Sequence, residues 1–130
     1  MDGAGVPLSL IVSGANRHDA KLLERTLDSV VIRRPRGRQH LCADKAYVGR
    51  PAARAMRTRG YTPHVRQRGE EARACRQGHR ARRWVVERTH SWFNRFRKLL
   101  VRYEKTEANF LALLHCAAAL ICWRMCRPKN

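Results

Sequence analysis

The chain has 130 residues, which allows one domain or a piece of one, and five cysteines without a CxxC pair, which disfavours a zinc site. Its 28 Lys and Arg against 10 Asp and Glu give a net charge of +18, a field that attracts nucleic acids and other polyanions. Met1–Leu10 lack the basic segment typical of a signal peptide, so a cytosolic chain with reduced thiols is expected.

The N-terminal residues predict a turn followed at once by a strand. Glycines in Asp2–Gly5 suit a turn, and Leu8, Leu10 and Val12 alternate within a predicted strand over Val6–Ser13. A strand directly after a turn is typical of the second half of a hairpin, and the first half is not in this sequence. The sequence therefore predicts a truncated sheet.

Helices and strands then alternate along the chain. Apolar spacing predicts a helix over Asp19–Val31, and a short apolar strand follows over Gln39–Ala43. A second helix, Arg50–Arg59, has a proline in its first turn and a glycine after its end, and it leads into a strand over Tyr61–Arg66. The polar stretch Gln67–Gly78 is expected to form a mobile connection. Such alternation favours an α/β sheet over a helical bundle.

Two helices are predicted after this stretch. The first covers Arg80–Lys105, where apolar side chains recur at alternating steps of four and three residues. Thr106 can cap a last helix that runs to about Arg127. This helix is apolar on most sides, so it is expected to be buried or packed against a partner. Its apolar run is shorter than a membrane span. The predicted stripe of the first helix comprises Val85, Thr89, Trp92, Phe96, Leu99 and Tyr103.

Two carboxylates are candidates for chemistry. Asp44 directly follows the strand Gln39–Ala43, and functional residues of α/β sheets concentrate at strand ends; the alternative is an Asp that starts a turn. Glu87 lies in a predicted helix one turn after Arg83, and the alternative is an ordinary ion pair within that helix. Read together, the two carboxylates suit Mg²⁺, which prefers oxygen ligands. A pair of such ions activates water or a 3′-hydroxyl for attack on a phosphodiester. Three carboxylates usually share this work, and the chain offers two good ones.

Several segments resemble one known family. Arg83–Leu99, followed by Arg102–Glu104, resembles the C-terminal motif of insertion-sequence transposases of the IS-five-like and IS-four-like group. Leu41–Gly49, with its Ala-Asp-Lys-Ala-Tyr core, resembles their second-aspartate motif. Gly5–Leu8 and Gly14–Asp19 resemble the strand and loop before that motif. The resemblance covers essentially the whole chain in the right order.

The resemblance implies an incomplete ribonuclease-H-like α/β fold, with a mixed sheet that lacks its first strands and with C-terminal helices. Residues 1–130 would be the C-terminal portion of a DDE transposase catalytic domain. The implied function is DNA transposition of an insertion sequence, with metal-dependent cleavage and transfer of DNA strands when the protein is complete. Asp44 matches the second catalytic aspartate and Glu87 the catalytic glutamate, and both would hold Mg²⁺ or Mn²⁺. The residues expected to bind DNA are Arg83, Arg88, Arg95, Arg97 and Lys98.

Two signature positions depart from the family pattern, and the first is Arg80, which stands where the family often has a tyrosine. Asn94 stands where the family has a lysine, so Arg95 or Arg97 would have to supply that cation. The first catalytic aspartate has no clear counterpart: Asp2 precedes a glycine as that residue would, but its surroundings match a later hairpin turn, so a turn residue is the preferred interpretation. The chain is therefore expected to be a degenerate remnant or the downstream frame of a frameshifted transposase.

The implied partners are transposon-end and target DNA, an upstream transposase segment and further copies of the chain, in the bacterial cytoplasm at the nucleoid and not at a membrane. The alternative is a catalytically inactive basic module that binds DNA or RNA; a ribosome-associated protein is a weaker one. Trp84, Trp92 and Phe96 could stack on DNA bases, although Trp92 and Phe96 lie on the apolar stripe and core packing is preferred for them.

Overall fold

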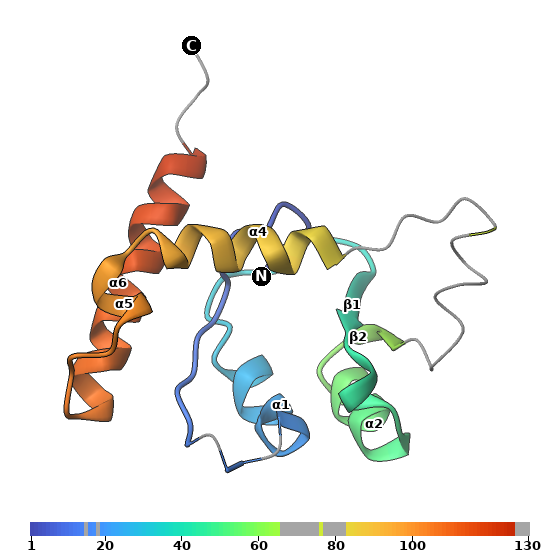
Figure 1. The fold of residues 1–130 in the computed structure, drawn as a ribbon. Helices are drawn as coiled ribbons and strands as arrows, with labels where there is room; N and C mark the ends of the chain where they lie inside the picture. Colours follow the sequence, from blue (N-terminus) through green and yellow to red (C-terminus); the bar gives the residue numbers. More distant parts are fainter. Residues whose placement is uncertain (15, 18, 66–75, 77–82, 127–130) are drawn as a thin grey trace. The chain divides into compact units, whose positions relative to one another are not determined.

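The computed structural model describes residues 1–14, 16–17, 19–65, 76 and 83–126 (Figure 1). The chain divides into two compact units: unit 1 comprises Met1–Val12 and Arg82–Asn130, and unit 2 comprises Ser13–Ala81. Helices and strands both occur, so the predicted α/β class is confirmed at that level. The predicted connection Gln67–Gly78 lies outside the described residues, apart from Arg76.

Unit 2 is built on two parallel strands. β1 (Gln39–Ala43) pairs with β2 (Tyr61–Val65) along their whole lengths, with Gln39 opposite Tyr61 and Ala43 opposite Val65. Parallel strands need a crossover connection, which here contains the 3₁₀ helix η1 (Lys45–Tyr47) and the helix α2 (Arg50–Thr58). Side chains alternate along both strands between partly buried and exposed, so one face of the sheet packs on the core of unit 2.

The core of unit 2 forms between two of its helices and this sheet. Leu23 and Leu27 stand one turn apart on α1 (Asp19–Asp28) and meet Ala55 and Met56 of α2. Met56 is fully buried, and burial of such a side chain contributes about 1.5–3 kcal/mol. The partly buried side chains that pack against this cluster are Leu41, Ala43, Tyr47, Ala52, Tyr61 and Val65.

A charged contact joins α1 to the end of α2. The Arg59 guanidinium donates to both Asp28 carboxylate oxygens, with Nε–Oδ1 at 2.6 Å and Nη2–Oδ2 at 2.8 Å, and it also donates to Glu24 at 3.1 Å. The hydrogen bond from Arg59 lowers the pKa of Asp28, and the hydrogen bond to Asp28 raises the pKa of Arg59. The planar guanidinium thus holds the two helices by a bidentate pair.

Unit 1 combines the N-terminal segment with three helices. These are α4 (Arg83–Asn94), the short α5 (Arg97–Leu100) and α6 (Glu107–Cys126). Its buried side chains, among the described residues, include Pro7 of the N-terminal segment, Val85 and Thr89 on α4, and Ala117 and Ile121 on α6. Thr106 accepts a hydrogen bond from the Asn109 N–H at 3.3 Å, so the prediction that it caps the last helix is confirmed.

The predicted strand over Val6–Ser13 is wrong. In the described residues this segment pairs with no other strand, and a strand exists only where a neighbour completes its hydrogen bonds. The helix predicted over Asp19–Val31 ends earlier, at Asp28, and Val31 is 90% exposed. The run Val30-Val31-Ile32 is β-branched throughout, which disfavours helix continuation.

The single helix predicted over Arg80–Lys105 is also wrong. α4 ends at Asn94, and Phe96 adopts an extended backbone with φ −91° and ψ 97° before α5 begins. The N–H groups of Arg95 and Phe96 bond to carbonyls three residues earlier, which tightens the last turn of α4. Tyr103 therefore leaves the predicted apolar stripe and is exposed.

α6 is less buried than its sequence predicted. Leu120, Trp123 and Met125 are exposed, while Ala117 and Ile121 are buried. By length and composition alone α6 could cross a membrane, although its apolar run looked too short in the sequence; core helices of soluble proteins share these properties. Part of this apolar helix is thus open to a partner.

Candidate functional site

Asp44 is held at the carboxyl end of β1. Its backbone is extended, with φ −68° and ψ 163°, and its Oδ1 accepts the Lys45 N–H at 2.5 Å as the cap of η1. The backbone of the turn is closed by the Tyr47 N–H, which donates to the Asp44 carbonyl at 2.9 Å. Tyr47 packs against the core of unit 2, so an exposed carboxylate stands on an anchored turn.

This geometry accommodates both interpretations of Asp44. Its side chain starts a turn, as the plainer interpretation holds. The turn also lies where β1 ends beside β2, since Ala43 pairs with Val65. The carboxyl ends of parallel strands are where α/β proteins place ligand sites. Asp44 serves as a cap at such a strand end, and its role as a metal ligand stays a prediction.

Glu87 lies on the exposed side of α4. Val85 and Thr89, two residues before and after it, are both buried. Two residues turn an α-helix by about 200°, so Glu87 faces away from the packed side. A carboxylate in this position is presented to a ligand rather than to the protein core.

The N-terminal segment fixes α4. The Asp2 carboxylate accepts the N–H groups of Ala4 and Val6 at 2.8 Å and 2.9 Å, which confirms Asp2 as a turn residue. The turn presents the Gly5 carbonyl to the buried Thr89 hydroxyl, which donates to it at 2.6 Å. The sequence showed the turn but not the contact, because the two partners lie far apart in the chain.

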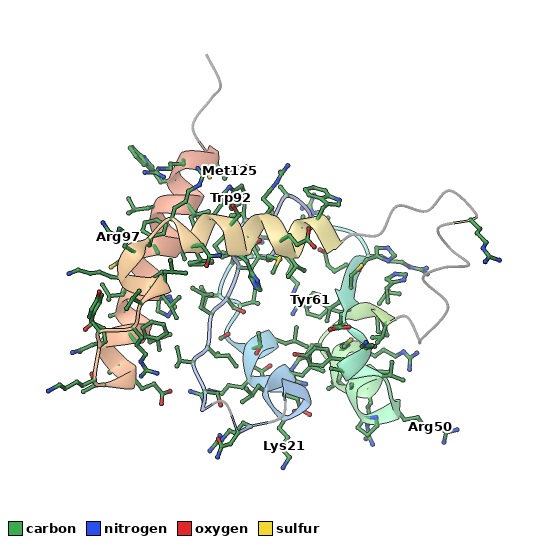
Figure 2. The ribbon with its side chains drawn as sticks, in the orientation of Figure 1. Lys21, Arg50, Tyr61, Trp92, Arg97 and Met125 are labelled. Atoms are coloured by element: carbon green, nitrogen blue, oxygen red, sulfur yellow. The ribbon has the colours of Figure 1, made fainter. Side chains whose placement is uncertain are left out.

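The predicted DNA-binding cations are distributed over two helices and the joint between them. Arg88 is on α4, Arg95 follows it, and Arg97 and Lys98 are on α5; all four are exposed. Figure 2 shows Arg97 on α5 and Trp92 on α4. Arg83 begins α4, and its side chain lies outside the described residues. Because the helix breaks after Asn94, these cations do not continue one helical face.

Arg88 makes the most defined contacts of this group. Its guanidinium carbon lies 4.6 Å from the centre of the Trp84 ring and 5.9 Å from the centre of the Trp92 ring. It also donates to the Ala4 carbonyl at 3.4 Å. The two distances from the guanidinium to the tryptophan rings are those of cation–π contacts.

The donor chemistry of Asp44 and Glu87 fits a divalent cation, because carboxylate oxygens are the ligands that Mg²⁺ and Mn²⁺ prefer. Asp44 belongs to unit 2 and Glu87 to unit 1. Within the described ranges, no three His, Cys, Asp or Glu side chains form a group that could hold a metal ion. The two residues thus fit the metal in kind but leave its ligand set incomplete.

A histidine pair on the sheet was missed in the sequence. His40 of β1 and His64 of β2 lie on its exposed face, with Nδ1 of His40 and Nε2 of His64 2.7 Å apart. The strand register explains this pair. Cys42 lies opposite His64, and His40 is two residues before Cys42 on the same face of β1, so the two histidines are diagonal neighbours.

Comparisons with known proteins support the resemblance found in the sequence. The family model described as the transposase DDE domain matches residues 41–124, a range that includes both Asp44 and Glu87. A relative from Burkholderia cepacia, assigned as the transposase for insertion sequence element IS402, is 36% identical over 135 residues. The alignment covers 99% of this chain and 63% of that relative. No solved structure matches the chain.

The matched family is one whose DDE domains use divalent metal ions, in keeping with the carboxylates described above. The match extends over more than half of the chain and spans parts of both units. The chain therefore belongs to the family of transposases with a DDE domain.

Proposed function

We propose that residues 1–130 are the C-terminal portion of a ribonuclease-H-like catalytic domain that moves an insertion sequence by cutting and joining DNA. The observation that carries this proposal is the placement of the two family carboxylates. Asp44 stands exposed at the end of a parallel strand, and Glu87 stands exposed on α4 opposite its packed side. Both belong to a chain with a net charge of +18, which attracts the DNA phosphates.

Asp44 and Glu87 would bind the divalent ions, Mg²⁺ or Mn²⁺, through their carboxylate oxygens. When bound, such ions activate a water molecule or a 3′-hydroxyl and stabilise the leaving oxygen of a phosphodiester. Arg83, Arg88, Arg95, Arg97 and Lys98 would neutralise the phosphates of the bound DNA. The fixed turn of Asp44 and the anchored α4 keep both carboxylates oriented before DNA binds.

A complete site needs a further carboxylate. The chain spans 63% of the length of its IS402 relative, so a longer protein has room for it. We propose that an upstream transposase segment supplies the first aspartate and the missing strands. The active form would contain more than one copy on the two transposon ends, at the nucleoid in the bacterial cytoplasm.

The test is cleavage of DNA that carries the terminal repeats of the element, in Mg²⁺ or Mn²⁺. The chain alone is compared with the chain joined to the sequence encoded upstream of it. We expect cleavage by the joined form, at least about 100-fold reduced by Glu87→Gln or Asp44→Asn, because removal of a metal-binding carboxylate disables the site. Glu107→Gln, an exposed carboxylate at the start of α6, is the matched control and should keep activity.

The second candidate is a catalytically inactive remnant that binds nucleic acid. It is favoured by the net charge of +18, which attracts nucleic acids without any catalytic site. This hypothesis predicts no cleavage by either form. DNA binding would weaken steeply with salt and would be unchanged by Glu87→Gln. Cleavage that survives Glu87→Gln would contradict the assignment of the carboxylates.

A further inference from the structure

Two exposed histidines converge on the open face of the sheet in unit 2. His40 of β1 and His64 of β2 are diagonal neighbours, with Nδ1 of His40 2.7 Å from Nε2 of His64. The ring centroids lie 4.9 Å apart, and the ring planes are tilted by 32°. Each imidazole thus brings one nitrogen to the same place. Neither histidine belongs to the carboxylates or cations of the proposed transposase site.

The sheet fixes where these two rings stand. β1 and β2 pair over their whole lengths, so the backbones that carry the histidines are joined by hydrogen bonds. Leu41, next to His40, and Val65, next to His64, pack against the core of unit 2. A ligand that binds both rings therefore finds them already placed, and it loses less affinity to ordering of the chain than it would on a loop.

The separation of the two nitrogens is close to that required by one shared metal ion. Zn²⁺ binds imidazole nitrogen at about 2.0–2.1 Å, so two such nitrogens at an angle of about 90–109° stand about 2.9–3.4 Å apart. The 2.7 Å between the histidine nitrogens reaches this range by a shift of about 0.2–0.7 Å. Exposed side chains make such a shift by small rotations about χ1 and χ2, without movement of the strands.

An ordinary hydrogen bond between the two rings is the alternative. It explains the 2.7 Å distance, but on an exposed face water competes for both partners, so the bond adds little stability. A metal ion can take the place of the shared proton. The imidazole that donates moves this proton to its other ring nitrogen, and both facing nitrogens then offer lone pairs. The hydrogen bond and the metal site thus use the same two atoms.

We propose that His40 and His64 bind a divalent transition metal ion of the Zn²⁺ class. Imidazole suits Zn²⁺, Ni²⁺ and Cu²⁺, whereas Mg²⁺ and Mn²⁺ prefer carboxylate oxygens. Within the described ranges, no third His, Cys, Asp or Glu completes a group with the two histidines, so water fills the remaining positions. Histidine ligands also set this site apart from the cysteine sites that the sequence disfavours. The ion links β1 to β2, and it thereby stabilises the strand that ends at Asp44.

The experiment follows the thermal midpoint of the full chain by circular dichroism, first with EDTA and then with Zn²⁺ alone. About 0.3 M salt screens the positive charge of the chain. Zn²⁺ should raise the midpoint of the wild-type chain by at least about 5 °C. His40→Ala, His64→Ala and the double variant should each lose most of this rise and to the same extent, because one imidazole alone does not chelate the ion. In EDTA all three should melt close to the wild type, because both side chains are exposed.

Two control variants test whether the histidine pair is the site. His90→Ala removes an exposed imidazole from α4 and should keep the full effect of Zn²⁺. Cys42→Ser should also keep it, although Cys42 lies opposite His64. The site would be overturned by the absence of a rise in the wild type, by a rise that survives in the double variant, or by a rise lost in Cys42→Ser and kept in His40→Ala.

The site and the proposed transposase function fail separately. Asp44→Asn should keep the Zn²⁺ effect while it removes cleavage that depends on Mg²⁺. A chain that cleaves DNA without any Zn²⁺ effect would keep the enzyme and reject the histidine site. A Zn²⁺ effect that depends on both histidines in a chain without cleavage would do the reverse.

Discussion

At the scale of single residues, Gly5 joins the N-terminal segment to α4. Its φ of +90° lies in the region that favours glycine, and its carbonyl accepts the buried Thr89 hydroxyl at 2.6 Å. A Cβ at position 5 would lie 3.1 Å from the Thr89 Oγ1 and 3.3 Å from the Val85 carbonyl oxygen. Position 5 is thus closed to larger side chains both by its backbone and by its surroundings.

We therefore expect Gly5→Ala to lower the free energy of unfolding of unit 1 by about 1–3 kcal/mol, from backbone strain and the tight contact with Thr89. Urea denaturation followed by tryptophan fluorescence measures the change. Gly3→Ala is the control, because a Cβ there meets nothing within 4 Å. Equal stabilities of the two variants would show that the Gly5 turn does not anchor α4.

Residues also show what the sequence could and could not predict about the site. The roles of Asp44 and Glu87 come from motifs, because their neighbours in sequence carry the family pattern, and these roles stay predictions. The prediction that Asp2 is a turn residue was correct, because an Asx turn is formed by residues that are close in sequence. The Gly5–Thr89 bond joins residues distant in sequence, and no local pattern encodes such a contact.

At the scale of elements, the ion pair of Arg59 and Asp28 makes the stability of the contact between α1 and α2 depend on pH. Arg59 lowers the pKa of Asp28 in the folded chain, so the folded chain binds a proton there less readily than the unfolded chain. The stability from this pair is present above the ordinary carboxyl pKa of about 4, and it is lost as pH falls through the lowered value.

We expect the thermal midpoint of the wild-type chain to fall more steeply than that of Asp28→Asn between about pH 5 and about pH 2. The amide introduced by this substitution cannot ionise, so its contact with Arg59 does not change over this range. Circular dichroism melts at several pH values measure both curves. Parallel curves would mean that the pair makes no net contribution, as is common for exposed ion pairs.

Elements with local signals were predicted well. β1 has the predicted bounds Gln39–Ala43, and α2 ends one residue before the predicted Arg59, because apolar alternation, Pro51 and Gly60 mark their ends. The break after Asn94 was missed, since apolar spacing continues across it while the backbone of Phe96 turns away from the helix. Periodicity reports which side chains share a face, and it does not report whether the helix between them is continuous.

At the scale of the whole molecule, α6 exposes apolar surface to solvent. Leu120, Trp123 and Met125 are exposed on α6, which also carries the buried Ala117 and Ile121, and exposed apolar surface favours association. We expect the chain alone to aggregate, and Leu120→Gln combined with Trp123→Gln to increase the soluble fraction at least about twofold. Centrifugation and light scattering measure the soluble fraction.

Co-expression with the upstream segment proposed above should produce a similar increase if that segment packs on α6. The control is Val86→Gln on α4, which removes an exposed apolar side chain outside α6. A wild-type chain that stays monomeric at high concentration would contradict the prediction.

The composition of unit 1 from two distant parts of the chain has a consequence for its synthesis. Met1–Val12 leaves the ribosome before unit 2, but its partners on α4 and α6 are made only after all of unit 2. At about 5–20 residues per second, the first segment waits several seconds or more for Thr89 to emerge. Unit 2 is continuous and can fold during this interval. A nascent chain stalled before α4 should therefore already resist proteolysis over Leu23–Val65, while its first residues remain open to chaperones.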